Sequence, residues 1–257
     1  MEKHEYKVMY DIEQTYWWFV GKQFLVRTIL KQLCRWRPKE IRILDIGCGT
    51  GIILKLLAHF GIPFGTELSP EAIQFLRQRG LNLIVRSDAN GPMPFKSNAF
   101  SVITCLDVLE HLDDDISLLK EMLRICKPGG RVIITVPALQ ILWSPHDAAL
   151  HHKRRYTKKQ ILNKMRHLNG QVVKCSYYNA ALLLPILAVR RVKTYCRDQK
   201  GVQSDFFMKM PGWLNRALAM LFVFEIGVLK HLDLPLGVSL LLILQKPDGR
   251  QTKPVLA

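Results

Sequence analysis

No stretch of this sequence reaches the roughly 18 uninterrupted apolar residues that a membrane-spanning helix needs. The nearest candidates are residues 180–189, which contain Pro185, and residues 217–224, which end just before Glu225. Both are expected to be too short to span a bilayer, although either could lie at a membrane interface. The sequence therefore predicts no transmembrane segment.

Cysteine pairs of the C-x-x-C kind, which bind zinc or cycle through disulfides, are absent. The six cysteines lie mostly inside apolar runs: Cys34, Cys48, Cys105, Cys126, Cys175 and Cys196. The first five residues, Met-Glu-Lys-His-Glu, are polar and do not read as a secretory signal. We therefore expect reduced core cysteines in a cytoplasmic protein, without a structural metal site.

Acidic residues are scarce in the C-terminal part of the chain. Residues 141–257 hold 19 Lys and Arg against 6 Asp and Glu, so this part carries +13 of the net charge of +16. Such an excess suits an anionic membrane surface, a phosphorylated substrate or a nucleic acid. Composition alone leaves these three partners open.

The sequence is rich in glycine at one place, the octapeptide Leu-Asp-Ile-Gly-Cys-Gly-Thr-Gly at 44–51, between an apolar strand and an apolar helix. Glycines let a ligand approach the backbone closely, and the helix N-terminus beyond them offers free amide groups. Glu67 follows Asp45 by about 20 positions, the distance at which an acid binds ribose hydroxyls in nucleotide-binding folds. The G-x-G-x-G spacing differs from the G-x-G-x-x-G that cradles a pyrophosphate.

Strands and helices are expected to alternate regularly from residue 40. The expected strands are 41–46, 62–67, 82–87, 100–106 and 131–137, and the expected helices between them are 51–60, 70–79 and 114–126. Ser69-Pro70-Glu71 is typical of a helix start, and the Lys-Pro-Gly-Gly run at 127–130 is typical of a helix stop. The alternation predicts a parallel, doubly wound α/β sheet that binds its ligand at the C-terminal ends of the strands.

The octapeptide resembles motif I of the class I S-adenosylmethionine (SAM)-dependent methyltransferases. The run Phe-Ser-Val-Ile-Thr-Cys-Leu-Asp-Val-Leu-Glu-His-Leu at 100–112 resembles their motif IV region, and the turn at 127–130 also matches. The resemblance covers about residues 40–137 and points to the quinone O-methyltransferase-like, type 11 proteins. It implies a Rossmann-like, seven-stranded, mostly parallel sheet and SAM as cofactor.

The resemblance also implies cofactor contacts. Asp45 and the glycine turn would hold the methionine end, Glu67 the ribose and Asp88 the adenine. The aromatic cluster at 16–19 with Lys22 either closes over the cofactor, Lys22 facing a carboxylate, or belongs to a helix pair covering the edge of the sheet. The expected cofactor-binding residues are Trp17, Lys22, Asp45, Gly47, Cys48, Gly49, Gly51, Glu67, Leu68, Asp88, Ala89, Leu106 and Asp107.

The acceptor is expected to meet residues beyond the fifth strand. His146, His151 and His152 are candidate general bases, because histidine titrates near neutral pH. Their spacing does not match a zinc pattern, so no metal is expected. The H-x-R-R-Y-T pattern at 152–157 resembles a bacterial subgroup associated with cell-envelope glycan and lipid biosynthesis, so its basic residues are either a phosphate clamp or a solvated turn. The expected substrate-binding residues are His111, Arg154, Arg155 and Tyr156.

The last two strands, 171–178 and 237–245, are expected to pair antiparallel. The link between them, 179–236, is too long for a plain loop and is expected to form two or three helices, as a substrate lid or a membrane-facing surface. The predicted organisation is a helical N-terminal cap (1–39), a SAM-binding core (40–178 and 237–247), this helical insertion (179–236) and a polar, disordered tail (248–257).

The predicted function is SAM-dependent methyl transfer to a small-molecule or lipid-linked acceptor, with O-methylation by a histidine base favoured. An anionic acceptor and a peripheral contact with the inner face of a membrane are further expectations. A nucleic-acid methyltransferase is disfavoured, because no Asn/Asp-Pro-Pro-Tyr/Phe segment follows the fourth strand. A non-catalytic SAM-binding protein is the other alternative. The identity of the acceptor and the oligomeric state stay open.

Overall fold

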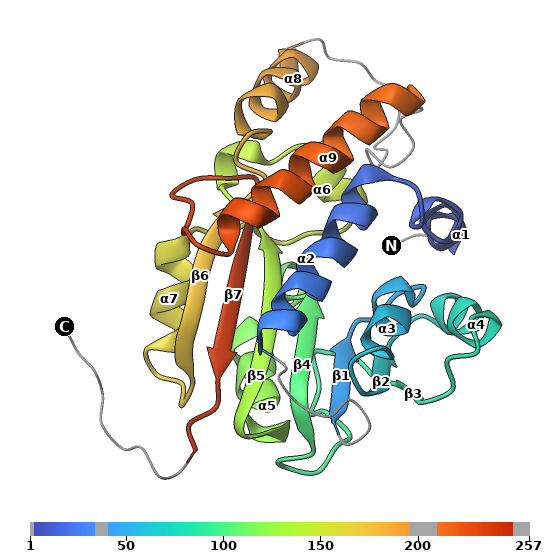
Figure 1. Cartoon of the computed structure of the whole chain (residues 1–257), viewed down its shortest axis with the longest axis vertical. Coiled ribbons are helices and arrows are strands. Elements are labelled where there is room, and N and C mark those ends of the chain that lie inside the picture. Colours follow the sequence, from blue (N-terminus) through green and yellow to red (C-terminus); the bar gives the residue numbers. More distant parts are fainter. Residues whose placement is uncertain (1–2, 34–40, 196–209, 249–257) are drawn as a thin grey trace.

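The computed structural model describes residues 3–33, 41–195 and 210–248, and for residues 3 and 191–195 it describes the backbone alone. One sheet of seven strands has the order β3-β2-β1-β4-β5-β7-β6 (Figure 1). The strands are β1 (Arg42–Ile46), β2 (Ile62–Glu67), β3 (Ile84–Arg86), β4 (Phe100–Leu106), β5 (Cys126–Pro137), β6 (Gln171–Tyr178) and β7 (Ser239–Gln245). Strands β1 to β5 are parallel, and β7 runs antiparallel to both β5 and β6. The predicted fold and its antiparallel edge are confirmed.

Helices cover both faces of the sheet. They are α1 (Lys3–Ile12), α2 (Trp17–Leu33), α3 (Ile52–Leu57), α4 (Pro70–Gln78), α5 (Asp115–Ile125), α6 (Pro145–Ala149), α7 (Lys158–Met165), α8 (Leu183–Tyr195) and α9 (Gly212–Leu229), with short 3₁₀ turns η2 (Leu109–His111) and η3 (Gln140–Leu142). Side chains of α2, α3 and α9 share one core cluster with Ile43, whereas those of α5 and α7 share the other with Leu44 and Ile46. This alternation along β1 explains why a strand buried on both faces reads as a continuous apolar run.

The predicted helix signals act as expected. The Ser69 hydroxyl accepts a hydrogen bond from the Ala72 amide at 3.3 Å, and Pro70 occupies the first position of α4. Helix α5 ends at Ile125, just before the 127–130 turn. The fifth strand starts earlier than expected, because the turn itself is extended: its Gly129 amide donates to the Lys246 carbonyl beyond β7.

The N-terminal helices contact both the sheet and the cavity described below. Helix α2 lies on the sheet and packs against α9 (Figure 1), so closely that a Cβ on Gly21 would come within 1.9 Å of the Phe222 ring. The ring centroid of Trp17, at the start of α2, lies 6.2 Å from the ring centroid of Phe222. The preceding helix α1 lines the cavity described below. The N-terminal part is thus a sheet cover that also closes the ligand site.

The insertion between β6 and β7 contains α8 and α9. Helix α9 is 18 residues long and, by length and composition alone, is apolar enough to cross a membrane, with 17% of it buried. The sequence expectation of stretches too short to span is therefore wrong for this helix. The apolar stretch was expected to end just before Glu225. The Glu225 side chain is instead buried within the fold, where it accepts a hydrogen bond from the Ala181 amide at 3.2 Å.

Some expectations fall on residues that the structure does not describe. Cys34, Cys196, positions 196–209 of the insertion and positions 249–257 of the expected tail lie outside the described residues. The other four cysteines are free and buried, as predicted: Cys48, Cys105, Cys126 and Cys175.

Candidate functional site

The glycine turn has a backbone that favours glycine. Gly47, Gly49 and Gly51 have φ angles of 68°, 54° and 94°, in the left-handed region that side chains disfavour. A Cβ on Gly47 would also lie 2.6 Å from the side chain of Val108. The turn is held to the next strand by the Gly47 amide, which donates to the Thr66 carbonyl at 2.9 Å. The geometry leaves open space above the turn, at the C-terminal edge of the sheet.

A cavity of about 560 Å³ lies at this edge. Expected site residues that line it are Trp17, Gly47, Gly49, Glu67, Leu68, Asp88, Ala89, Leu106, Asp107, His111, His146, His152 and Arg155. A smaller cavity of about 120 Å³ beside it is lined by the expected residues Lys22, Asp45 and Cys48, and shares Gly47, Gly49, Leu106 and Asp107. Gly51, His151, Arg154 and Tyr156 line neither. The fold thus gathers nearly all of the expected cofactor residues in one place.

Glu67 stands where a ribose-binding acid is expected, at the end of β2. One carboxylate oxygen accepts the Gly49 amide at 2.8 Å, and the other accepts the amides of Leu68 at 2.9 Å and Ser69 at 3.0 Å. These bonds tie the glycine turn to the β2 loop. Because a carboxylate has about four lone-pair sites, Glu67 keeps capacity for a hydroxyl donor from the cavity.

Asp45 lies deeper, at the end of β1. Its carboxylate is buried and accepts a hydrogen bond from the Thr104 hydroxyl at 2.6 Å. Burial raises the pKa of Asp45 to about 7, against the lowering effect of the Thr104 bond. A positively charged group in the small cavity would favour the ionised form. The α-amino group at the methionine end of SAM, the part that the sequence assigns to Asp45, carries such a charge.

Lys22 lines the smaller cavity, but its ammonium is already paired within the fold. Its ammonium lies 2.6 Å from the Asp107 carboxylate and 2.7 Å from the Thr135 hydroxyl. Burial alone would lower the pKa of Lys22, but the Asp107 charge outweighs it and the pKa is raised. The carboxylate that Lys22 faces in the structure is thus that of Asp107, the residue directly after β4. Asp107 lines both cavities, and Lys22 lines the smaller one.

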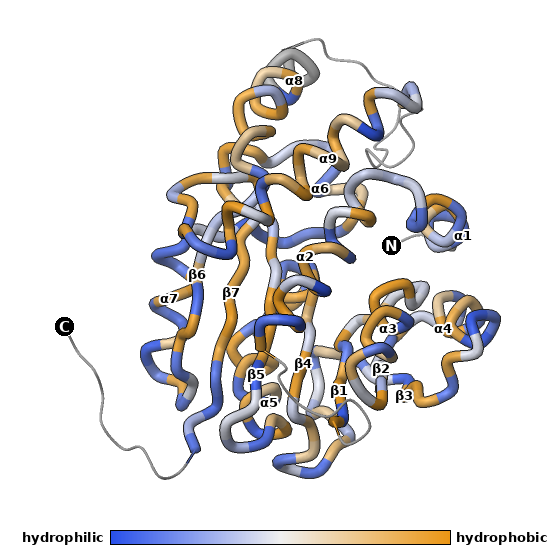
Figure 2. Tube along the Cα trace, in the orientation of Figure 1, coloured by the Kyte–Doolittle hydropathy of each residue, from blue (hydrophilic) through white to orange (hydrophobic). Residues whose placement is uncertain are grey.

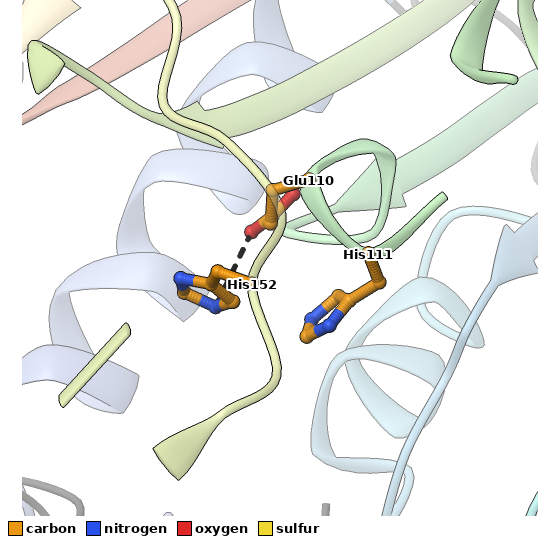
Figure 3. A group of neighbouring side chains, drawn as sticks. All are labelled: Glu110, His111 and His152. Atoms are coloured by element: carbon orange, nitrogen blue, oxygen red, sulfur yellow. Dashed lines mark ion pairs between the residues drawn. The ribbon is translucent and has the colours of Figure 1, made fainter. Parts of the chain in front are cut away.

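A cluster of acid and imidazole groups stands on the acceptor side of the large cavity. Figure 3 shows the Glu110 and His152 side chains turned toward each other, with His111 beside them; the Nε2 atom of His152 lies 3.9 Å from Oε1 of Glu110. The ring centroids of His111 and His152 are 4.9 Å apart, and those of His146 and His152 are 6.4 Å apart. Burial first, and then the His152 charge, lowers the pKa of His111 to about 4.

Asp147 orients this cluster. Its Oδ1 atom lies 3.0 Å from Nδ1 of His152, and the Arg155 guanidinium binds both carboxylate oxygens at 2.8 and 3.0 Å. Burial alone would raise the pKa of Asp147, but the His152 hydrogen bond and the Arg155 charge lower it below the usual range. An ionised carboxylate only accepts, so Nδ1 of His152 carries a proton, and Nε2 is the acceptor nitrogen of the neutral ring. Among the three candidate bases, His152 therefore has its geometry set by a carboxylate.

The basic run at 153–155, left open as a phosphate clamp or a solvated turn, is ion-paired within the fold. The consecutive residues Lys153, Arg154 and Arg155 each pair with a different aspartate, at 2.6 Å from Asp113, 3.5 Å from Asp115 and 2.8 Å from Asp147. Only Arg155 reaches the cavity wall. Three charges pointing to three partners cannot converge on one phosphate.

Tyr156 and His151 also depart from their expected roles. Tyr156 is a core residue whose hydroxyl donates to Asp115 at 2.7 Å. His151 has a φ of 56° and is exposed, outside both cavities. Both sit in a basic, polar run that gives no periodic pattern, so the sequence could not show which of its side chains turn inward.

One group among the described residues could hold a metal ion. Glu110, His111 and His152 each offer one ligand atom, and these atoms lie within 4.8 Å of one another. The sequence expectation of no metal stays a prediction. The sequence feature that pointed to Glu110 was its position after β4, within the motif IV region. That position is compatible with a helix-capping role as well as with a functional one.

Several cavity residues were not among the expected site residues. They include Tyr6, Met9, Tyr16, Trp18, Phe19, Ser87, Asn90, Val108, Glu110, Ile186 and Arg190. The aromatic run at 16–19 was the sequence feature that pointed to the four aromatic side chains at the start of α2. Ile186 and Arg190 come from α8, far along the chain, and no local pattern links that helix to the site.

Comparison with known proteins agrees with this geometry. Residues 44–134 match a family described as a methyltransferase domain. A ubiquinone biosynthesis O-methyltransferase from Xanthomonas oryzae is 29% identical over 100 residues, which cover 37% of this chain and 42% of that protein. The corresponding protein of Coxiella burnetii is 26% identical over 145 residues, covering 52% and 62%. The chain thus spans about half the length of the curated relatives that it matches.

A solved structure of the same fold holds the cofactor. Phosphoethanolamine N-methyltransferase 2 of Haemonchus contortus, in complex with SAM, superposes with a TM-score of 0.55 at 18% identity, covering 86% of this chain and 52% of that one. At this identity the likeness establishes the fold. Residues 44–134 thus match a methyltransferase domain, the fold around them is that of SAM-dependent methyltransferases, and the glycine turn with its cavity fits SAM as the cofactor.

Proposed function

We propose that the protein transfers the methyl group of SAM to a hydroxyl oxygen of a small-molecule acceptor, and that His152 is the general base. The observation that carries this proposal is the Asp147–His152 hydrogen bond of 3.0 Å in the wall of the large cavity. The curated relatives are O-methyltransferases by name, which supports oxygen as the atom methylated.

The reaction is an in-line displacement, so the protein's main task is to position donor and acceptor. The acceptor oxygen attacks the methyl carbon, the carbon–sulfur bond breaks, and S-adenosylhomocysteine leaves. The hydroxyl proton passes to Nε2 of His152, whose other nitrogen is held by Asp147. A neutral hydroxyl is a weak nucleophile, and a positioned base adds about 10²- to 10⁴-fold in rate.

The cavity wall favours an acceptor with an apolar body. Trp17, Trp18 and Phe19 line one side of it, and Ile186 of α8 lines it as well. Arg155 and Arg190 are the cationic residues in the same wall, but both are bound to Asp147. These features support a hydrophobic or lipid-linked acceptor more than a polyanionic one.

The test compares His152→Asn with His151→Asn. His151 lies next in the chain but outside the cavity, so it is a matched control. With isotope-labelled SAM and a lipid extract as acceptor source, His152→Asn is expected to lower turnover by about 10²-fold or more while SAM affinity stays unchanged. Equal turnover in both variants would remove His152 as the base. SAM binding without any labelled product from any extract would favour a non-catalytic role.

A further inference from the structure

Helix α9 carries an exposed apolar stripe on the side that faces away from the sheet. Trp213, Met220 and Phe224 are 72%, 67% and 71% exposed. With the exposed Ala217 they repeat every three or four residues, which places them on one face over a length of about 16 Å. Figure 2 shows hydrophobic residues along much of this helix.

Helix α8 adds to this surface at the same end of the molecule (Figure 1). Its Leu184 is 74% exposed and its Val189 is 51% exposed. The two helices are joined by the Ala181–Glu225 hydrogen bond ahead of α8 and by a shared core cluster. We call the exposed residues Leu184, Val189, Trp213, Met220 and Phe224 the outer apolar patch.

Two exposed cations lie on or next to α9. Arg216, one turn from Trp213 and from Met220, is exposed, and so is Lys230 just after α9. The acid within α9, Glu225, is buried and faces Ala181 instead of solvent. Exposed aromatic and aliphatic side chains bordered by cations suit the headgroup boundary of an anionic bilayer, where Trp and Arg are favoured.

Helix α9 does not need to leave the protein to reach a membrane. Its inner face is packed into the fold: Phe222, Ile226 and Leu229 are buried, and the Phe222 ring stacks on Tyr178 at 5.8 Å. A spanning orientation would expose all of these contacts. The observed packing keeps one face of the helix in the protein and leaves the other face outward.

The same end of the molecule borders the ligand site. Ile186 and Arg190 of α8 line the large cavity, whereas Leu184 and Val189 of the same helix are exposed. The helix is therefore the wall between the cavity and the outer apolar patch.

We propose that the outer apolar patch docks the protein peripherally on an anionic membrane surface, with α9 lying in the plane of the interface. This docking goes beyond methyl transfer and does not require it. Helix α8 would then lie between the cavity and the lipid. The cavity would be at the depth of the bilayer headgroups, where a lipid-linked acceptor presents its own headgroup.

The test is co-sedimentation of the full chain with phosphatidylcholine vesicles, with and without phosphatidylglycerol. Binding is expected to the anionic vesicles, and to weaken as salt rises. Trp213→Gln with Phe224→Gln is expected to weaken binding at least tenfold. Arg216→Gln with Lys230→Gln should weaken it about fivefold per charge, the equivalent of about 1 kcal/mol each.

Matched controls remove exposed groups elsewhere. Leu83→Gln replaces an exposed apolar residue, and Lys55→Gln with Lys96→Gln removes two exposed charges. These variants should bind vesicles as the unaltered chain does. SAM affinity, measured for every variant, reports that the fold is intact.

Three results would overturn the proposal. The first is no binding to any vesicle by a folded, SAM-binding protein. The second is binding that the patch variants leave unchanged. The third is a dimer in light scattering that the patch variants convert to a monomer, because the patch would then be an interface between two copies of the chain.

Discussion

The Nδ1 atom of His152 lies 3.0 Å from Oδ1 of Asp147, and the Arg155 guanidinium donates hydrogen bonds to both oxygens of the same carboxylate. The arrangement places a proton on Nδ1 of His152, so Nε2 is the acceptor nitrogen of the neutral ring, and His152 lines the large cavity. It gives the base a set orientation before any acceptor arrives.

Asp147→Asn tests this arrangement. The amide cannot enforce the same tautomer, so turnover should fall by about 10²-fold or more, with SAM affinity unchanged, in a steady-state assay with labelled SAM. His146→Asn is the control, since that ring lines the same cavity 6.4 Å from the His152 ring. A larger loss in His146→Asn than in Asp147→Asn would assign the base to His146.

Glu67→Ala is expected to weaken SAM binding by about 1–3 kcal/mol, because a charged acceptor is lost both for the ribose and for the Gly49 amide. Calorimetry measures the change. Asp88→Ala is the comparison variant for Glu67→Ala. Asp88 also lines the cavity, but it is hydrogen-bonded to Asn90 and not to the glycine turn. If Glu67→Ala keeps full affinity in a folded protein, the ribose is held elsewhere.

His111 should remain neutral down to a pH of about 4, because burial lowers its pKa to that value. The unfolded chain takes up this proton near pH 6.5, so the stabilising contribution is complete above about 6.5 and is lost as the pH falls toward 4. The free energy of unfolding should therefore fall more steeply over this window in the unaltered chain than in His111→Gln. Denaturant titrations at several pH values, with an NMR titration of the ring, measure both quantities. A ring that titrates near 6.5 would contradict the assigned burial.

Gly21→Ala should destabilise the protein by about 1–3 kcal/mol, because its Cβ would meet the Phe222 ring where α2 crosses α9. Gly227→Ala, on α9, meets nothing within 4 Å and should instead stabilise by up to about 1 kcal/mol. Chemical denaturation compares the two. Equal effects of both substitutions would mean that α9 is not packed on α2 as described.

Much of the fold was predictable because its signals are local. The glycine turn at 44–51, the Ser69 cap and the buried strands each follow from neighbouring residues. The cofactor side of the site is built from these same strand ends, so its residues followed too.

The acceptor side was less predictable, because its partners meet only through the fold. Lys22 and Asp107 are far apart in the chain, so their ion pair in the smaller cavity could not be read from the sequence. Tyr156 and Arg154 stand beside Arg155 in the sequence, yet Asp115 takes both of them away from the cavity. The burial of Glu225 likewise depends on α8, so the sequence underestimated the length of the apolar helix.

The most direct test of the account is methyl transfer itself. The purified protein, methyl-labelled SAM and a membrane extract from cells lacking the protein are combined, and mass spectrometry follows the label. The account predicts a labelled product, S-adenosylhomocysteine in equal amount, and loss of both in Gly49→Val, whose side chain is disfavoured at a φ of 54° in the SAM-binding turn. A folded protein that binds NAD instead of SAM, or a labelled product that Gly49→Val forms equally well, would contradict it.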